Sequence, residues 1–496
     1  PKGRVNRLTR WWDRLRTDLR DLLAPAAGPD AGLYTYPIEL EGGRRRIHLR
    51  LEPDGAGVLF IDVNDVIHLN ATAAQMAKLA LDRVPVVEAE SRMRRRFRNV
   101  PGSRLAEDLA EVYTMVDQLR SPEAGCPTCA LADRLGFKPV FSTPVSAPFK
   151  ADLALIYACN NACAHCYNEP GRFAMDSLEL TEWRQVLDKL AEIGVPHIIL
   201  TGGEPTLHPD LPDIVRHADG LGLIVGMNSN GRRLADPPLV EILAAAGLNH
   251  VQITLESCRA AVHDGMVGRE GAFDQTVAGI QQALTGGIHT ITNTTLTRHN
   301  ADHALEILAF LDDLGLRTFA MNGIIHAGGG YNTPEAIPTD EMTALLAAVR
   351  DEASARGMRF LWYTVTEYCQ LSPLALGLQP KRCNAAEYSI CIEPNGDVLP
   401  CQSYYVSAGN ILTDPWPAIW NSDLFLSFRD REENPEAAGL PEACWDCPDL
   451  EVCGGGCRLE REARAGIRAA ERGCARSRVR PAGDREPARS GRSRVS

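Results

Sequence analysis

The chain has 496 residues and a formal net charge of −12, and this length suits about two to four domains with large cores. A negative net charge argues against a protein that binds nucleic acid nonspecifically, because that binding depends on positive charge. No apolar run reaches the ~18 residues of a membrane span and no signal-peptide core stands near the N-terminus, so we expect a cytoplasmic protein without an integral membrane segment.

Residues 1–30 are predicted to hold an amphipathic helix. Apolar residues recur at helical spacing between Val5 and Leu22, and arginines surround them. A helix at a membrane surface has this pattern, and so has a helix that packs on the protein by its apolar stripe. The second interpretation is favoured, because aspartates within the segment dilute its positive charge.

Residues 31–120 are predicted to form a winged-helix-like domain. Several short strands are expected between residues 33 and 70. Helices are expected after them, one from Ala71 to Asp82 with Asn70 as its N-cap and one from about Ser103 to Leu119.

This order of elements and the phrase Leu69-Asn70-Ala71-Thr72-Ala73-Ala74 resemble the small winged-helix domain that chaperones the pyrroloquinoline quinone precursor peptide. That domain is also found fused to peptide-modifying radical enzymes. The resemblance implies that a leader peptide adds as an extra strand on an exposed sheet edge. A DNA-binding winged helix is the alternative, and the acidic second helix disfavours it.

Residues 121–150 are predicted to be a linker, and they contain Cys126-Pro-Thr-Cys129. A CxxC pair can bind metal or take part in disulfide exchange. No second pair stands next to it in the sequence, so we assign it no role.

Residues 151–365 are predicted to form a barrel. Short β-rich runs alternate with amphipathic helical runs, which indicates a parallel sheet covered by helices. The expected strands are 152–157, 197–201, 223–229, 250–256, 289–296 and 317–325, and the last expected helix is Thr339 to Gly357. In such barrels the functional site lies at the C-terminal ends of the strands.

Cys159, Cys163 and Cys166 directly follow the first of these strands. Three thiolates so spaced can hold a [4Fe-4S] cluster and leave one iron unligated, whereas a structural cluster is normally closed by four cysteines. An open metal position leaves room for a small molecule to bind the metal. Downstream, a helical stretch and the second strand lead into a Gly-Gly-Glu-Pro motif, whose glycines permit a close backbone approach.

The cysteine triplet and this motif resemble those of the radical S-adenosylmethionine (SAM) enzymes. The resemblance implies an α/β fold with a partial (β/α)6 TIM-type barrel, SAM bound to the open iron, and reductive cleavage of SAM to a 5′-deoxyadenosyl radical. It assigns the backbone and polar groups of the motif to SAM, at Gly202, Gly203, Glu204 and Pro205.

Further residues of the loop and of the strand ends are candidates for contacts with SAM. They are His165, Ser229, Asn230, Thr254 and Asn293, together with Asn228, Glu256 and Thr295. The ring of His165 is expected near the adenine, although the family more often has Tyr or Phe there. Strand caps and turns are the alternative role for these side chains.

A second cysteine system lies in residues 366–475. Cys383 is followed by twelve residues, Gly396, four residues and Cys401, and later comes Cys444-x2-Cys447-x5-Cys453-x3-Cys457 with Cys474 beyond. In a reducing compartment such spacings indicate iron or zinc rather than disulfides. The pattern resembles the cysteine-rich C-terminal SPASM extension of radical SAM enzymes, and zinc knuckles are the alternative.

The resemblance implies one or two auxiliary iron-sulfur clusters. One would be held by Cys444, Cys447, Cys453 and Cys474, and another by Cys383, Cys401 and Cys457. The fourth ligand of the latter is open between Cys369, Cys391 and an unfilled position.

The hairpin around Gly396 bears on that choice. Glu393 to Asp397 is predicted to be a hairpin with a three-residue loop and Gly396 in the left-handed conformation. In that register Cys391 opposes Leu399 and lies on the same face as Cys401. Family members often take this ligand from upstream of Cys383, which favours Cys369.

Two remaining features are given no function. Residues 476–496 are predicted to be a disordered basic tail, because they combine many Arg with Ser, Pro and Gly and have almost no large apolar residue. Cys258, alone after the fourth barrel strand, is expected to be a small apolar filler.

Together these features predict an enzyme that matures a ribosomally made precursor peptide. A peptide dock, a radical generator and an electron-transfer module would follow one another along the chain. Hydrogen abstraction from an unactivated carbon would lead to a crosslink, a thioether or an oxidation, with the auxiliary clusters accepting the electron. A flavodoxin- or ferredoxin-type reductant is the partner that the resemblance implies.

Three alternatives are kept. Oxidation of a protein side chain, as in the anaerobic sulfatase-maturing enzymes, is disfavoured, because those enzymes carry an Asp after the cysteine that matches Cys401 and this chain has Gln402. Action on a tetrapyrrole or another small molecule requires no peptide dock. A non-catalytic iron-sulfur or peptide-binding scaffold would leave Gly202 to Pro205 without a role.

Overall fold

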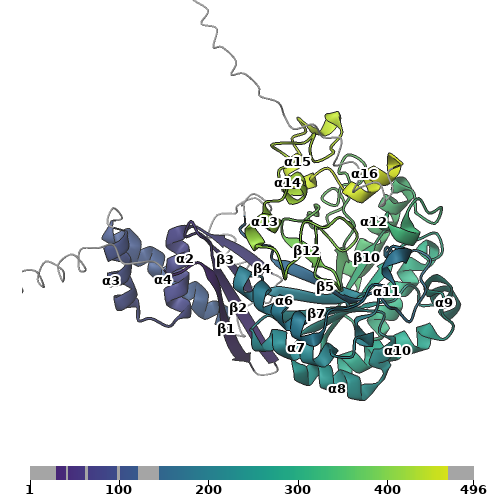
Figure 1. The fold of residues 1–496 in the computed structure, drawn as a ribbon, viewed down its shortest axis with the longest axis horizontal. Coiled ribbons are helices and arrows are strands. Elements are labelled where there is room, and N and C mark those ends of the chain that lie inside the picture. The colour runs from purple at the N-terminus through teal and green to yellow at the C-terminus, as the bar shows by residue number, and fades with distance from the viewer. Residues whose placement is uncertain (1–28, 41–42, 62–64, 98–100, 121–144, 467–496) are drawn as a thin grey trace, which may run out of the picture.

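A computed structural model of the chain describes residues 29–40, 43–61, 65–97, 101–120 and 145–466 (Figure 1). The predicted N-terminal helix, the Cys126–Cys129 pair, Cys474 and the predicted basic tail lie outside the described residues. Among the residues that are described, no helix is long and apolar enough to cross a membrane.

A four-stranded antiparallel sheet and three helices form the N-terminal part of the described chain (Figure 1). The elements are β1 (Gly32–Leu40), β2 (Gly43–Leu51), β3 (Gly57–Ile61), β4 (Asp65–Leu69), α2 (Ala71–Leu81), α3 (Val86–Arg96) and α4 (Gly102–Arg120). The strands pair in chain order, and the helices share one apolar core with the sheet. The predicted cap is confirmed, because Asn70 Oδ1 accepts a hydrogen bond from Ala73 N at 2.9 Å.

Helix α3 is not among the predicted elements. Only Ala89 and Met93 of its residues are buried. Such a narrow apolar stripe gives a weak helical signal in a segment rich in arginine.

Strand β2 attaches this sheet to the barrel. Its alternate residues Arg46, His48 and Arg50 are buried on the face that points away from the N-terminal core. His48 Nε2 donates to Gly222 O at 2.8 Å, and an Arg50 amino group donates to Gly194 O at 3.2 Å. These carbonyls lie at or just beyond the C-terminal ends of two barrel helices, where positive and donor groups are favoured.

Nine strands form the second sheet, in the order β11-β10-β9-β8-β7-β6-β5-β12-β13. They are β5 (Lys150–Ile156), β6 (His197–Gly202), β7 (Ile224–Ser229), β8 (His250–Thr254), β9 (His289–Thr295), β10 (Thr318–Asn322), β11 (Arg359–Trp362), β12 (Ser389–Ile392) and β13 (Val398–Leu399). Neighbouring strands are parallel except β12 and β13.

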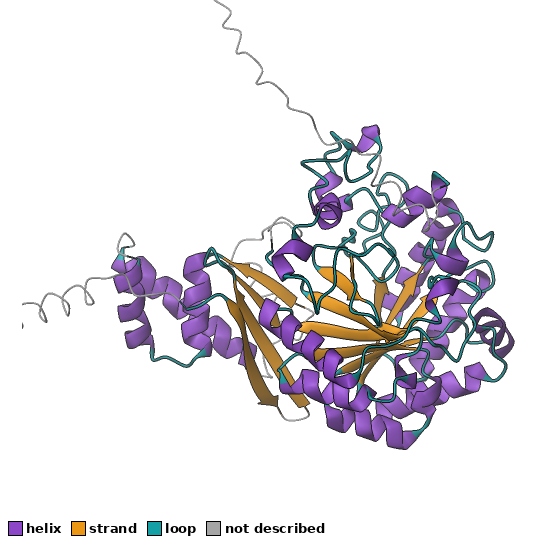
Figure 2. Ribbon diagram, viewed as in Figure 1, coloured by secondary structure: helices purple, strands orange, loops and turns teal. Residues whose placement is uncertain are grey.

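Helices cover the outer face of this sheet (Figure 2). They are α6 (Leu180–Ile193), α7 (Leu211–Gly220), α8 (Pro237–Ala246), α9 (Ala260–Val267), α10 (Ala272–Thr285), α11 (Ala304–Asp313) and α12 (Thr339–Ala355). The C-terminal extension adds α13 (Trp416–Trp420), α14 (Asp423–Arg429), α15 (Leu450–Cys453) and α16 (Arg458–Arg464). The α/β barrel and the cysteine-rich extension confirm the predicted fold class.

The six predicted barrel strands agree with β5 to β10 to within three residues at either end. Two further parallel neighbours were not predicted. β11 is a short strand after α12, and β12 brings the C-terminal extension onto the open edge of β5, with Cys391 beside Asp152 in the register. The predicted hairpin is confirmed: Cys391 pairs with Leu399, and Gly396 has a φ of +86°.

Acidification is expected to weaken the attachment of the N-terminal sheet. Burial lowers the pKa of His48 from 6.5 to about 4, so the folded protein keeps the ring neutral where the unfolded chain already binds a proton. The stabilisation is therefore complete above pH 6.5 and is lost as the pH falls towards 4, and the loss reaches about 2 kcal/mol at pH 5.

The variant His48→Gln checks this, because its amide can still donate to Gly222 O but does not titrate. Chemical denaturation at neutral pH and near the lower limit of the range should show a smaller loss of unfolding free energy in the variant than in the wild type. Equal losses in the two proteins would contradict the assignment to His48.

Candidate functional site

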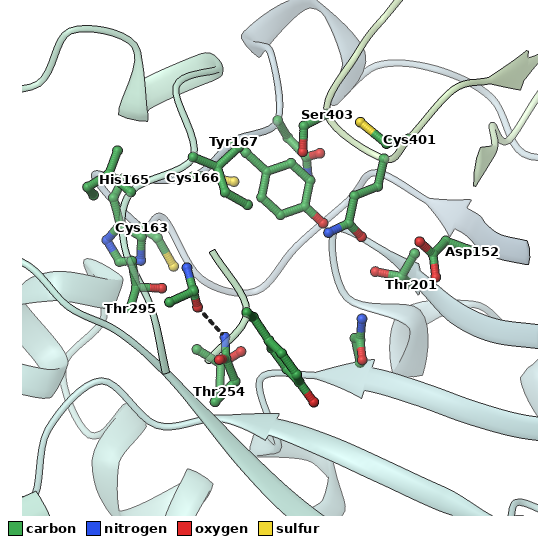
Figure 3. Close-up of a pocket in the computed structure, with 18 of the residues that line it drawn as sticks. Asp152, Cys163, His165, Cys166, Tyr167, Thr201, Thr254, Thr295, Cys401 and Ser403 are labelled. Carbon is green, nitrogen blue, oxygen red and sulfur yellow. Dashed lines mark hydrogen bonds between the residues drawn. The ribbon is translucent and has the colours of Figure 1, made fainter. Parts of the chain in front are cut away.

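A cavity of about 950 Å³ opens at the C-terminal ends of the barrel strands. Its wall is formed by the loop after β5, by the ends of β6 to β10 and by the C-terminal extension. Figure 3 shows Cys163 and His165 on one side of the cavity, and Cys401 and Asp152 on the other. The cavity therefore lies where a βα barrel places its functional site.

Cys159, Cys163 and Cys166 line this cavity from a single loop. Burial raises the pKa of all three thiols, so the thiolate form requires a cation close by. Asn161 N donates to Cys159 Sγ at 3.4 Å, a contact of the kind that tunes ligated sulfur. This donor set fits an iron-sulfur cluster.

The turn after β6 lies against the end of β5. Gly203 N donates to Ile156 O at 2.7 Å. A Cβ on Gly202 would stand 2.2 Å from Ile156 O, and a Cβ on Gly203 would stand 2.3 Å from Tyr157 O, closer than side chains ever approach. Glycine is therefore required at both positions, and both line the cavity.

Glu204 is fully buried and joins this turn to the end of β7. Its carboxylate accepts hydrogen bonds from Thr206 N at 3.1 Å, from Ser229 Oγ at 2.9 Å and from Asn230 N at 2.8 Å. Burial raises its pKa, and the donors oppose that rise. Glu204 and Pro205 are not among the residues that line the cavity, so this carboxylate orders the cavity wall from behind.

The remaining predicted SAM contacts come together around the cavity. They are His165, Asn228, Ser229, Asn230, Thr254, Glu256, Asn293 and Thr295. Asn293 Nδ2 donates to Asn322 Oδ1 at 2.7 Å. Its Oδ1 is buried and has no hydrogen-bond partner among the described residues, so it suits a ligand that donates a hydroxyl or ammonium proton.

His165 contacts a buried carboxylate. Its Nε2 lies 2.9 Å from Glu256 Oε1, and Glu256 Oε2 accepts from Thr295 N at 2.8 Å. Burial lowers the pKa of His165, but the charge and hydrogen bond of Glu256 raise it overall. The ring thus ties the cysteine loop to the ends of β8 and β9.

Cys383, Cys401 and Cys457 line the same cavity from the C-terminal extension. Burial and then the Cys383 thiol raise the pKa of Cys401 to about 12 and that of Cys457 to about 11. Cys391 is fully buried and packs with Tyr157 and other apolar groups instead of lining the cavity.

Cys444, Cys447 and Cys453 form a separate group farther along the extension. Tyr368 N donates to Cys453 Sγ at 3.3 Å. Burial, Glu367 and the thiols of Cys453, Cys369 and Cys447 raise the pKa of Cys444. Cys369 therefore lies beside this group.

Asp152 is a cavity residue that our sequence analysis did not single out. Its side chain is 5% exposed, and Lys150 Nζ donates to it at 3.1 Å. The signal is in the alternation of β5: Ala151 and Leu153 are fully buried in the outer core, so Asp152 points to the inside of the barrel. Gln402 lines the same region, and its buried Oε1 has no partner within the described ranges.

Two family models match the chain. The model described as the radical SAM superfamily matches residues 153–311, and the iron-sulfur cluster-binding SPASM domain matches residues 383–448.

Curated relatives of known name cover the same part of the chain. A PqqA peptide cyclase of Xanthomonas campestris pv. campestris (strain 8004) is 30% identical over 359 residues, which are 69% of this chain and 92% of the relative. An AdoMet-dependent heme synthase of Methanosarcina barkeri is 30% identical over 339 residues, 65% of this chain and 94% of the relative.

Solved structures share the fold. Streptococcus suis SuiB bound to S-adenosylmethionine has a TM-score of 0.62 at 18% identity and covers 84% of this chain and 95% of its own. SuiB bound to the precursor peptide SuiA has a TM-score of 0.62 at 17% identity and covers 86% and 96%. The enzyme anSMEcpe with bound AdoMet has a TM-score of 0.51 at 16% identity and covers 64% and 91%.

The variant Gly203→Ala is expected to bind SAM at least about tenfold more weakly, because its Cβ displaces the turn from the cysteine loop. Gly220→Ala is the matched control, since nothing lies within 4 Å of a Cβ at that helical position. Equilibrium binding of SAM to the anaerobically reconstituted proteins checks this. Unchanged affinity in Gly203→Ala would show that the turn does not shape the SAM site.

Proposed function

Because this chain belongs to the radical SAM enzymes that carry a SPASM iron-sulfur domain, we propose that its substrate is a ribosomally made precursor peptide. The 5′-deoxyadenosyl radical that the [4Fe-4S] cluster and SAM supply when bound would abstract a hydrogen from that peptide. The product would be a crosslink, a thioether or an oxidised residue.

One observation carries this proposal: two groups of cysteines face one cavity. Cys163 and Cys166 stand on one side, and Cys401 stands on the other with Cys383 and Cys457 (Figure 3). A substrate side chain in the space between them would lie close both to the radical source and to an auxiliary cluster. That placement suits a reaction that removes a hydrogen and then an electron.

The residues of the cavity divide into two roles toward SAM. Cys159, Cys163 and Cys166 would hold the cluster, and Gly202 and Gly203 would present backbone to the SAM ammonium. The polar side chains of the wall would contact the rest of the cofactor, namely His165, Ser229, Asn230, Thr254 and Asn293.

We assign Cys383, Cys401 and Cys457 to one auxiliary cluster, and Cys444, Cys447, Cys453 and Cys474 to the other. For the fourth ligand of the former, the position of Cys369 beside Cys453 supports Cys391 or an open position over Cys369. Cys391 is held near Cys401 by the hairpin register.

Residues 31–120 would bind the leader segment of the peptide as an added strand. Within the described residues, β1 and β4 are the edges of the N-terminal sheet, and β4 exposes Val66. The buried contacts of β2 with the barrel would hold such a dock at a fixed distance from the cavity. The name of the PqqA peptide cyclase relatives supports a peptide substrate.

A cytoplasmic location and a flavodoxin- or ferredoxin-type reductant belong to the same proposal. The cysteines of the described residues are free thiols, which suits a reducing compartment. The heme synthase among the relatives supports a second candidate, a tetrapyrrole or other small molecule as substrate.

Coexpression with each short reading frame beside the gene tests the proposal. The wild type is expected to remove pairs of hydrogens from one of these peptides, seen by mass, and to release 5′-deoxyadenosine after reduction with dithionite. Cys163→Ala should lose both activities by at least about a hundredfold, because a missing ligand removes the radical source.

Cys258→Ala is the control, since Cys258 packs against the barrel core away from the cavity wall. It should keep both activities. Release of 5′-deoxyadenosine by Cys163→Ala would disprove the cluster assignment, whereas a modified small molecule with every peptide unchanged would favour the second candidate.

A further inference from the structure

The loop that carries Cys166 and the loop that carries Cys401 meet through the hydroxyl of Tyr405. This hydroxyl donates to Asn168 Oδ1 at 2.9 Å and lies 3.3 Å from the backbone oxygen of Tyr167. Tyr405 follows Cys401 by four residues, and Asn168 follows Cys166 by two. The two proposed ligand loops are thus joined side chain to side chain.

Asn168 passes this contact on to the turn of the SAM site. Its side chain is 4% exposed, and its Nδ2 donates to Gly202 O at 3.1 Å. Since the oxygen of the same amide accepts from Tyr405, both ends of the amide are occupied and only one orientation satisfies them. The carbonyl of Gly202 is therefore oriented from the auxiliary side of the cavity.

The ring of Tyr405 is held independently of its hydroxyl. The Arg172 guanidinium lies 3.9 Å from the ring centroid, a distance at which cation and ring attract. Arg172 forms an ion pair with Glu393 in the β12–β13 hairpin, and Tyr157 donates to the same carboxylate at 2.9 Å. Removal of the hydroxyl alone leaves these contacts in place.

We propose that Tyr405 and Asn168 are positioning residues through which the SPASM extension sets the geometry of the SAM-binding turn. The inference rests on the proposed function only in taking SAM as the ligand of that turn. Neither residue needs to touch SAM, because Asn168 acts through the carbonyl of Gly202. The SAM site would then be complete only when the extension is folded onto β5.

The variant Tyr405→Phe tests this without any peptide. After anaerobic reconstitution it should keep the iron content of the wild type and bind SAM about three- to tenfold more weakly, the effect of one lost buried hydrogen bond. The change that SAM causes in the EPR spectrum of the reduced protein should also differ from that of the wild type. A merely structural role of Tyr405 would not move this spectrum at constant iron content.

Tyr404→Phe is the matched control. Its hydroxyl lies 3.2 Å from Glu462, and its ring packs against Phe428 at 5.0 Å, away from the SAM turn. It should bind SAM and give the spectrum as the wild type does. Equal SAM affinity and spectra in Tyr405→Phe and wild type, or equal changes in both tyrosine variants, would overturn the proposal.

Asn168→Asp separates the two hydrogen bonds. It keeps an acceptor for Tyr405 but turns an oxygen towards Gly202 O, so SAM affinity should fall further than in Tyr405→Phe. If Tyr405→Phe does not retain iron, Asn168→Asp decides with the same measurements, and unchanged SAM affinity overturns the proposal. A wild type that binds no SAM contradicts the proposed function instead, so the two failures are distinguishable.

Discussion

The parallel pairing of β12 with β5 is the contact on which the arrangement of the site depends. The barrel sheet would otherwise end at β5, the strand that leads into the cysteine loop. β12 covers this edge with a strand of the C-terminal extension, so Cys401 comes to face Cys163 across one cavity. An exposed strand edge attracts other chains, and here the edge is used to assemble two cysteine systems.

Buried carboxylates fasten the segments that meet around the cavity. Glu204 joins the turn after β6 to the end of β7, Glu256 joins His165 of the cysteine loop to β9, and Glu393 joins the hairpin to Arg172. Each of these side chains is no more than 2% exposed. A buried carboxylate is costly unless donors surround it, so each one fixes the position of its partners. The wall is therefore ordered largely by polar contacts, while the outer face of the sheet packs through apolar ones.

The sequence predicts the local parts of this structure well. Strand alternation placed β5 to β10, the Asn70 cap placed the start of α2, and the turn residues of Glu393 to Asp397 placed Cys391 opposite Leu399. These predictions depend on residues only a few positions apart. The strand-end residues around the cavity were also predictable, because parallel strands bring their C-terminal ends to one rim.

Contacts between distant residues escape such reasoning. β12 has four residues and pairs with a strand more than 230 positions earlier, and nothing local in its sequence specifies that partner. The same holds for Tyr405 with Asn168 and for Cys369, whose place beside Cys453 depends on how the extension folds. Asp152 is an intermediate case, since the alternation of β5 carried its signal.

Iron counting tests the central claim, that two separate cysteine systems serve one cavity. The variant with Cys159, Cys163 and Cys166 all changed to Ala should lose the iron of one cluster after anaerobic reconstitution and keep the auxiliary iron. Release of 5′-deoxyadenosine should fall to background in the same preparation. Iron close to zero, with zinc in its place, would contradict the account.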